Sequence, residues 1–249
     1  MGKALAVVVM AAGRGTRMKN PDVAKVMYTV ADRPMIDHVV DLALELNSVR
    51  TITVVGWQKD AVIEHMIRTM RPVVCVEQSP QLGTGHAVMQ TEGELDGFDG
   101  DVLVLSGDVP LLTRETAGRL VESHRASGAV ATVLTTILDD ATGYGRIIRN
   151  EEGFVVGIVE HKDATEKQRT IAEINSGIYV FDRGTLFAGL KHITPHNAQK
   201  EYYLTDVFHY FWKNDLPVQA VVADDPTEVQ GVNTIEQLEG ARAVLTLRG

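Results

Sequence analysis

Cysteine is almost missing from this 249-residue chain: Cys75 is the only one, which excludes an internal disulfide. Its place in the apolar run 73–76 predicts a buried, reduced thiol and favours a cytoplasmic protein. No apolar run approaches the roughly 18 residues that a membrane-spanning helix needs, so we expect no membrane partner. The eight histidines form no HExxH pattern and a CxxC pair is impossible, so zinc is not expected.

Positive charge is also in deficit. The chain has 24 Lys and Arg against 33 Asp and Glu, a net charge of −9, so a nucleic-acid surface would have to form against the overall field. We therefore expect no nucleic-acid partner, and any anion site must be local. The hydrophobic (45%) and charged (23%) fractions match those of folded domains and exclude a disordered chain.

Short β-branched apolar runs alternate with helical patterns in the first half of the chain. Continuous apolar runs predict buried parallel strands; they cover residues 5–10, 51–55, 73–76 and 102–105. Amphipathic helices are expected at residues 35–46, 61–70, 85–94 and 113–123. This order predicts an α/β fold with a doubly wound, mostly parallel, Rossmann-like sheet.

The pattern changes after residue 123. Strands are expected at 129–138, 146–149 and 154–160, the last two joined by a hairpin, which predicts a smaller mixed-sheet lobe. A strand at 178–181, a helix at 202–213, a strand at 218–223 and a helix at 235–247 follow. We predict a single domain over 1–249, divided into a first half (1–112), a second half (113–232) and a terminal helix (233–249).

A glycine-rich loop follows the first predicted strand and contains Ala11, Ala12, Gly13 and Gly15. Glycines allow backbone N–H groups to approach a phosphate closely at the carboxyl end of a strand. Arg17 and Lys25 add positive charge nearby. A tight strand-exit loop with solvated basic side chains fits the loop alone equally well. The spacing is neither that of a dinucleotide-binding loop nor that of a Walker A loop.

Asp108 follows the apolar run 102–105, just after Gly107 allows the chain to turn. Magnesium takes one or two protein oxygens and completes its shell with phosphates and water. One carboxylate facing the glycine loop is therefore enough to hold this ion. The alternative is that Asp108 caps the turn at Pro110.

A collinear set of longer motifs covers nearly the whole chain. After the glycine loop these are EQSPQLGTGHA (77–87), LSGDVPL (105–111), TGYGRI (142–147), GIVEHKDAT (157–165), EINSGI (173–178) and NAQKEYYLTD (197–206). Together they resemble the sugar-nucleotide pyrophosphorylase family. Within it, they are most similar to the uridylyltransferase domains of bacterial bifunctional enzymes that also carry an acetyltransferase domain.

The resemblance implies transfer of UMP from UTP to N-acetylglucosamine 1-phosphate, in the service of cell-wall peptidoglycan synthesis, with Mg²⁺ as cofactor. By this resemblance the first half binds the nucleotide through Ala11, Ala12, Gly13, Gly15, Gln78, Gly83 and Thr84. The catalytic residues would be Arg17, Lys25 and Asp108, and the metal ligands Asp108 and Asn233. The second half would bind the sugar through Gly145, Glu160, Asn175, Tyr203 and Thr205.

The chain departs from the family at Ala24, where proline is common, and at Asp32, where glycine is usual. Hexapeptide repeats of the left-handed β-helix acetyltransferase domain are absent, so acetyl transfer is not expected. Because that β-helix assembles the subunits in the family, the oligomeric state stays open.

Other interpretations of the same residues remain. The chain could transfer a uridylyl or thymidylyl group to another hexose 1-phosphate, or a cytidylyl group to an acidic sugar, although Glu160 would repel the latter. A nucleotide-sugar-binding module without turnover is a further alternative. Asn233 could cap the terminal helix. We interpret His86 and His161 as structural, and residues 208, 211 and 212 as core.

Overall fold

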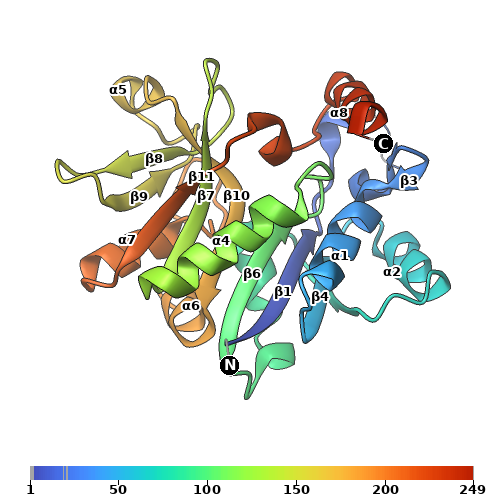
Figure 1. Ribbon diagram of the computed structural model, residues 1–249, viewed down its shortest axis with the longest axis horizontal. Helices are drawn as coiled ribbons and strands as arrows, with labels where there is room; N and C mark the ends of the chain where they lie inside the picture. Colours follow the sequence, from blue (N-terminus) through green and yellow to red (C-terminus); the bar gives the residue numbers. More distant parts are fainter. Residues whose placement is uncertain (1–2, 19, 21, 249) are drawn as a thin grey trace.

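The computed structural model describes residues 3–18, 20 and 22–248, which fold around a nine-stranded sheet (Figure 1). Its main path is β11-β7-β10-β6-β1-β4-β5. These strands are β1 (Ala4–Ala11), β4 (Arg50–Val55), β5 (Val74–Glu77), β6 (Gly100–Ser106), β7 (Ala131–Ile137), β10 (Glu173–Asp182) and β11 (Val218–Val222). Only β10 runs antiparallel to its neighbours on this path. The predicted doubly wound, mostly parallel sheet is confirmed.

The smaller lobe is a hairpin of β8 (Arg146–Arg149) and β9 (Val155–Val159), which joins the sheet through β10. A separate two-stranded sheet, β2 (Thr29–Val30) and β3 (Arg33–Pro34), is closed by a tight turn. Asp32 in this turn has φ 61°, in the left-handed region that favours glycine. The glycine that the resemblance leads us to expect at this position would suit this backbone conformation.

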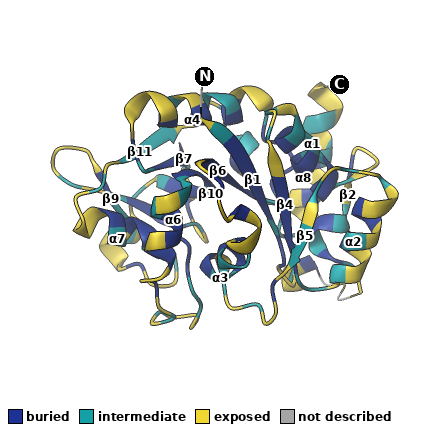
Figure 2. Ribbon diagram, turned by 90° about the horizontal axis from the view of Figure 1, so that it is seen from below, coloured by how far each residue is buried: buried dark blue, intermediate teal, exposed yellow. Residues whose placement is uncertain are grey.

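Helices cover both faces of the sheet (Figure 2). One face packs against α1 (Met35–Glu45), α2 (Lys59–Arg68) and α4 (Arg114–Ser127). The other face packs against α3 (Thr84–Met89), α6 (Arg183–Leu190) and α7 (Asp206–Lys213). Along β1, Val7 and Val9 belong to the first core, whereas Ala6 and Val8 belong to the second. A strand buried on both faces needs a continuous apolar run, and that is why the sequence pattern identified it.

Of two short helical elements near the glycine loop, η2 (Lys25–Met27) packs into the first core through Val26. The other, η1 (Thr16–Met18), packs with the terminal helix α8 (Ile235–Arg248). A third small core joins these segments; it comprises Met18, Val30, Met35, Leu111, Val232, Leu238 and Ala241. Three of its members adjoin predicted site residues in sequence: Met18 follows Arg17, Val232 precedes Asn233, and Leu111 follows the Asp108 turn. Apolar packing therefore fixes the backbone beside each of these polar residues.

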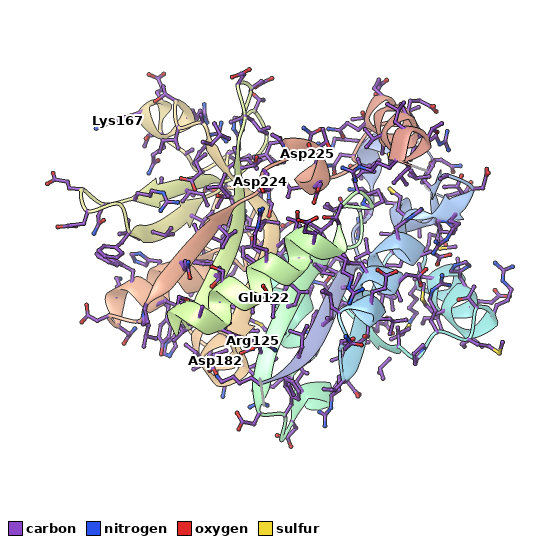
Figure 3. The ribbon with its side chains drawn as sticks, in the orientation of Figure 1. Glu122, Arg125, Lys167, Asp182, Asp224 and Asp225 are labelled. Atoms are coloured by element: carbon purple, nitrogen blue, oxygen red, sulfur yellow. The ribbon has the colours of Figure 1, made fainter. Side chains whose placement is uncertain are left out.

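An ion network around one buried carboxylate joins the amino ends of β1 and β6. Asp101, only 1% exposed, accepts a hydrogen bond from Arg125 Nε at 2.7 Å. Lys3 Nζ lies 3.9 Å from Asp101 and donates to Asp182 at 3.2 Å. Figure 3 labels Arg125 and Asp182 at this end of the molecule. At the opposite end of the same two strands, their carboxyl ends lead into the glycine loop and the Asp108 turn.

Several predictions from the sequence were wrong in detail. The run at 73–76 is not buried: it lies in β5 at the edge of the sheet, and Cys75 is half-buried. Burial nevertheless raises the pKa of the Cys75 thiol, which keeps it protonated. Phe208 and Phe211 belong to the core as expected, but Trp212 is 44% exposed. The short helices α5 (Glu166–Arg169) and α6 were not anticipated.

No helix in the described part of the chain combines the length and the apolar character required to cross a bilayer.

The aromatic cluster of the second core provides a test of the packing. Phe181 is fully buried, with ring centroids 5.5 Å from Tyr179 and 5.8 Å from Phe208. Phe181→Ala should lower the free energy of unfolding by about 3–5 kcal/mol, because it leaves a cavity among rings. Urea denaturation measures the change. Phe154→Ala, at a 62% exposed position, is the control and should change it by less than about 0.5 kcal/mol; equal losses would refute the assignment.

Candidate active site

The glycine loop and the Asp108 turn lie side by side because β1 and β6 are parallel neighbours. Met10 pairs with Ser106 at the carboxyl ends of the two strands. Gly107 N then donates to Met10 O at 2.9 Å, which carries the contact into the loops. The structure therefore brings together two motifs that are almost a hundred residues apart in the sequence.

Two cations, one carboxylate and one amide oxygen meet beside these loops. Lys25 Nζ donates to Asp108 Oδ2 and, at 2.7 Å, to Asn233 Oδ1. Arg17 Nη2 donates to the same Asn233 oxygen at 2.8 Å. We call Arg17, Lys25, Asp108 and Asn233 the charged centre. Asn233 thus faces the other polar residues of the site, and its position is not explained by helix capping alone.

Backbone geometry holds Lys25 in place. Gly15 has φ 59°, and a Cβ there would lie 2.6 Å from Lys25 Cβ, so the glycine makes room for the lysine. Ala24 has φ −57°, a value that proline also adopts, so alanine and proline place the next residue in the same way. Val232 N donates to Asp108 O at 2.8 Å and holds the Asn233 segment against the Asp108 turn.

The charged centre can be tested for its fit to a divalent cation. In the part of the chain that the structure describes, no three His, Cys, Asp or Glu side chains gather as metal ligands. Asp108 and Asn233 instead offer one carboxylate and one amide oxygen, and both face the same cation, the Lys25 ammonium. Hard oxygen donors in this small number suit magnesium, which takes its other ligands from phosphates and water.

A cleft of about 580 Å³ extends from the charged centre along the carboxyl ends of the strands. Most residues assigned to the nucleotide by resemblance line it: Ala11, Ala12, Gly13, Gln78, Gly83 and Thr84, together with Lys25 and Asp108. Gly15 and Arg17 do not line this cavity. Gly15 lies against Lys25, and Arg17 donates to the Asn233 oxygen that also accepts from Lys25. We call this cavity the nucleotide cleft.

A second cavity of about 200 Å³ shares Met10, Thr84 and Ser106 with the nucleotide cleft. Four of the five predicted sugar residues line it: Gly145, Glu160, Asn175 and Thr205. The fifth, Tyr203, is buried and its hydroxyl lies 3.3 Å from Asp163 Oδ2, to which it donates. We call this cavity the second pocket. The two cavities are therefore neighbours, with these three residues lining both.

Hydrogen bonds orient the polar side chains of the second pocket. Thr205 Oγ1 donates to Glu160 Oε1 at 3.0 Å. Asn175 Nδ2 donates to Tyr179 Oη at 2.8 Å, and Asn175 Oδ1 accepts from Gly177 N at 3.1 Å. Each polar group is thus held in one orientation, and the pocket presents a fixed pattern of donors and acceptors.

The loops of the two cavities are joined by backbone contacts. Gly85 N donates to Tyr202 O at 2.8 Å, and Tyr202 N donates to Leu82 O at 2.7 Å. Thr84 Oγ1 accepts from Leu204 N at 3.0 Å. Gly83 has φ 107°, and a Cβ there would lie 2.6 Å from Tyr202 O. A side chain at position 83 would therefore push the two loops apart.

Sequence reasoning missed several residues that line these cavities. Arg14, Gln81, Ser106 and Glu201 line the nucleotide cleft, and Tyr144 and Tyr179 line the second pocket. Most of these residues lie inside motifs that the sequence analysis identified. A motif does not show which of its side chains face the cavity, so these residues were not singled out. Tyr179 lies just beyond the EINSGI motif and had no signal of its own.

Burial dominates the electrostatics of the second pocket. It raises the pKa of the Glu160 carboxyl, against the opposing hydrogen bond from Thr205. Burial first, and the negative charge of Asp163 second, raise the pKa of Asp206 to about 6. Asp206 therefore gains its negative charge as the pH rises through about 6.

The raised pKa of Asp206 predicts a pH-dependent stability. A carboxyl whose folded-state pKa of about 6 exceeds its ordinary 3.8 stabilises the fold below pH 3.8, and this contribution is lost as the pH rises through 6. Asp206→Asn should therefore raise the free energy of unfolding at pH 8 relative to the unmutated chain, and the gain should vanish near pH 4. Urea denaturation at both pH values measures it, with the exposed Asp99→Asn as control. A gain independent of pH would contradict the assignment.

Comparisons with known proteins identify a family for this chain. Residues 6–226 match the sequence profile of the nucleotidyl transferase family. Bifunctional protein GlmU from Heliobacterium modesticaldum is 49% identical over 238 residues, which are 96% of this chain and 51% of that protein. Bifunctional protein GlmU from Geobacillus thermodenitrificans is 45% identical over 238 residues, with the same shares covered. This chain spans about half the length of the curated relatives it matches.

A solved structure of UDP-glucose pyrophosphorylase complexed with UDP-glucose superposes with a TM-score of 0.79. All of both chains is covered at 18% identity, so this likeness concerns the fold. The profile match extends over most of the sequence, from β1 to the start of the segment before α8, and includes both cavities. This chain therefore belongs to the nucleotidyl transferase family.

Proposed function

We propose that this protein transfers UMP from UTP to N-acetylglucosamine 1-phosphate and releases pyrophosphate. The observation that carries the proposal is the pair of neighbouring cavities, one beside the charged centre and one lined by oriented polar groups. The motifs that resemble uridylyltransferase domains, and relatives at 44–49% identity named Bifunctional protein GlmU, support this choice of substrates.

In the proposed reaction, a phosphate oxygen of the sugar phosphate attacks the α-phosphorus of UTP. The bond from that phosphorus to the oxygen bridging to the β-phosphate breaks, and pyrophosphate leaves with the electron pair. A phosphate anion is already a nucleophile, so no side chain has to remove a proton. Catalysis then depends on bringing two anions together and on stabilising the leaving group.

The charged centre has the composition for this task. Arg17 and Lys25 would neutralise the triphosphate and the departing pyrophosphate, the first through a planar fork and the second as a point charge. Asp108 and Asn233 would hold Mg²⁺, which when bound supplies further positive charge to the phosphates. Lys25 would then exchange its contacts with Asp108 and Asn233 for contacts with phosphate oxygens.

The second pocket fits a neutral sugar with several hydroxyls. Glu160 and Thr205 offer acceptors for hydroxyl groups, because the Thr205 hydroxyl already donates to Glu160. The free N–H of Asn175 can donate to an acetamido oxygen. Tyr203 would act from outside the lining, by holding the loop that carries Thr205. The carboxylate of Glu160 would repel an acidic sugar. In this proposal residues 1–112 bind the nucleotide and residues 113–232 the sugar.

A pyrophosphate-release screen tests the proposal. UTP, TTP, CTP and ATP are each combined with 1-phosphates of N-acetylglucosamine, glucose and galactose, with Mg²⁺ or with excess EDTA. UTP with N-acetylglucosamine 1-phosphate should exceed every other pair by at least about tenfold, the scale of specificity that a few polar contacts provide. Release should fall to background in EDTA and return when Mg²⁺ is restored.

Lys25→Met, purified in the same way, is the control for a contaminating enzyme. It removes the charge of a residue that lines the nucleotide cleft, whereas a contaminant would keep its activity. Loss of an electrostatic stabiliser should lower turnover by about 10²–10³-fold. Equal release with another sugar phosphate would replace the proposed acceptor, and an absence of release with every pair would contradict an enzymatic role.

A further inference from the structure

The amide of Gln78 is held in one orientation at the edge of the nucleotide cleft. Gln78 is 3% exposed, and its Nε2 donates to Gly83 O at 2.9 Å and to His86 Nδ1 at 3.1 Å. The backbone carbonyl of Gly83 can only accept, so it identifies the nitrogen end of the amide. Both N–H groups of Gln78 are therefore used by the protein.

The other end of the amide remains available. Gln78 Oε1 receives no hydrogen bond from any residue within the described ranges, although Gln78 lines the nucleotide cleft. The cleft thus presents a carbonyl acceptor at this point. A ligand that reaches Gln78 must supply an N–H or O–H donor, because an acceptor there would face Oε1 without a proton between them.

His86 must be neutral to make its contact with Gln78. A neutral imidazole has one acceptor nitrogen and a protonated one has none. A second amide flanks the ring: Gln90 Nε2 donates to His86 O at 3.0 Å and lies 3.3 Å from His86 Nε2. Since a neutral ring has one acceptor, the shorter contact assigns it to Nδ1, so Nε2 carries the hydrogen and its contact with Gln90 is not a hydrogen bond. A doubly protonated ring would instead place an N–H against both amide nitrogens. Burial lowers the pKa of His86 and keeps the ring neutral.

We propose that His86 is a positioning residue for nucleobase selection: its Nδ1 lone pair fixes the Gln78 amide so that Oε1 faces the cleft and accepts a ring N–H of the base. This rests on the proposed function and specifies its nucleotide. Uracil and thymine carry a hydrogen on N3, whereas N3 of cytosine carries a lone pair. The arrangement therefore selects uridine or thymidine nucleotides and rejects cytidine nucleotides.

Removal of the His86 imidazole should reduce the discrimination between nucleobases less than removal of the Gln78 amide. Without His86 Nδ1, one buried N–H of Gln78 loses its acceptor, and the amide gains freedom to rotate about its remaining bond to Gly83 O. The loss of one such hydrogen bond corresponds to about a fivefold change in a binding constant. Gln78→Leu removes the acceptor altogether and gives the upper limit of the effect.

Isothermal titration of the protein with UTP and with CTP, in Mg²⁺ and without sugar phosphate, measures the selection directly. The ratio of the two dissociation constants should fall at least about fivefold in His86→Leu and further in Gln78→Leu. His86→Asn places an amide oxygen near the former Nδ1 and should restore the ratio. His192→Leu is the matched control, because His192 is exposed and stacks on Tyr210 outside both cavities.

A structural role alone would lower the affinity for both nucleotides equally, so an unchanged ratio in His86→Leu overturns the inference. In the unmutated protein, the ¹⁵N resonances of His86 provide a second test that needs no folded variant: above neutral pH, Nδ1 should be unprotonated and Nε2 should carry the hydrogen. A protonated Nδ1 would overturn the proposal.

The test separates this inference from the proposed function. If the unmutated protein prefers UTP but transfers to another sugar phosphate, the acceptor was wrong and the role of His86 stands. If the unmutated protein binds UTP and CTP equally, both the proposed nucleotide and the role of His86 are wrong.

Discussion

The contact of Lys25 with Asp108 and Asn233 joins three segments that are far apart in the sequence, and the rest of the site is arranged around it. It depends on the pairing of β1 with β6, which places the glycine loop beside the Asp108 turn. It also depends on the small core under α8, which fixes the backbone next to Arg17 and Asn233. A charge cluster of this kind is stable only while both signs are present, because an unpaired charge in a partly buried site is costly.

This balance has a consequence for ligand binding. In the protein alone, the Lys25 ammonium is paired with Asp108, whereas Arg17 meets only the neutral amide oxygen of Asn233, so the centre keeps a net positive charge. A triphosphate and a divalent cation that bind together can satisfy all of these groups at once. The phosphates would pair with Arg17 and Lys25, and the metal would bind the oxygens of Asp108 and Asn233. Either partner alone would leave some of these groups unpaired. The centre therefore favours binding of the metal and the nucleotide together.

The fold could be predicted where burial on both sides leaves a clear pattern. The runs at 5–10 and 102–105 identified β1 and β6 because both faces of these strands are covered. The run at 73–76 was wrongly predicted to be buried. It forms part of β5, which lies at the edge of the sheet, and an edge strand can have a similar apolar sequence although it pairs with only one strand. Trp212 shares the helical spacing of Phe208 and Phe211 but lies at the rim of the packed face. Periodicity shows which side of a helix is apolar, but it does not show how much of that side other elements cover.

The candidate site could be predicted in part. Motifs at the carboxyl ends of strands indicated Asp108 and the glycine loop with Lys25 nearby, because parallel strands bring such ends to one edge. The loop between β5 and α3 was assigned by resemblance. Resemblance supplied Asn233 and the polar residues of the second pocket. His86 was interpreted as structural, since a lone histidine in a sequence does not show that its ring nitrogen holds the amide of Gln78. Which side chains satisfy one another is decided by tertiary contacts.

The most direct test of the charged centre is the binding of Mn²⁺ in a ternary complex with UTP, followed by electron paramagnetic resonance. Asp108→Ala should weaken the ternary complex by more than the roughly tenfold that loss of an outer-shell partner costs. Asp224→Ala, at a side chain that is 82% exposed, should leave it unchanged. A complex that forms equally well with the unmutated protein and with Asp108→Ala would contradict the account.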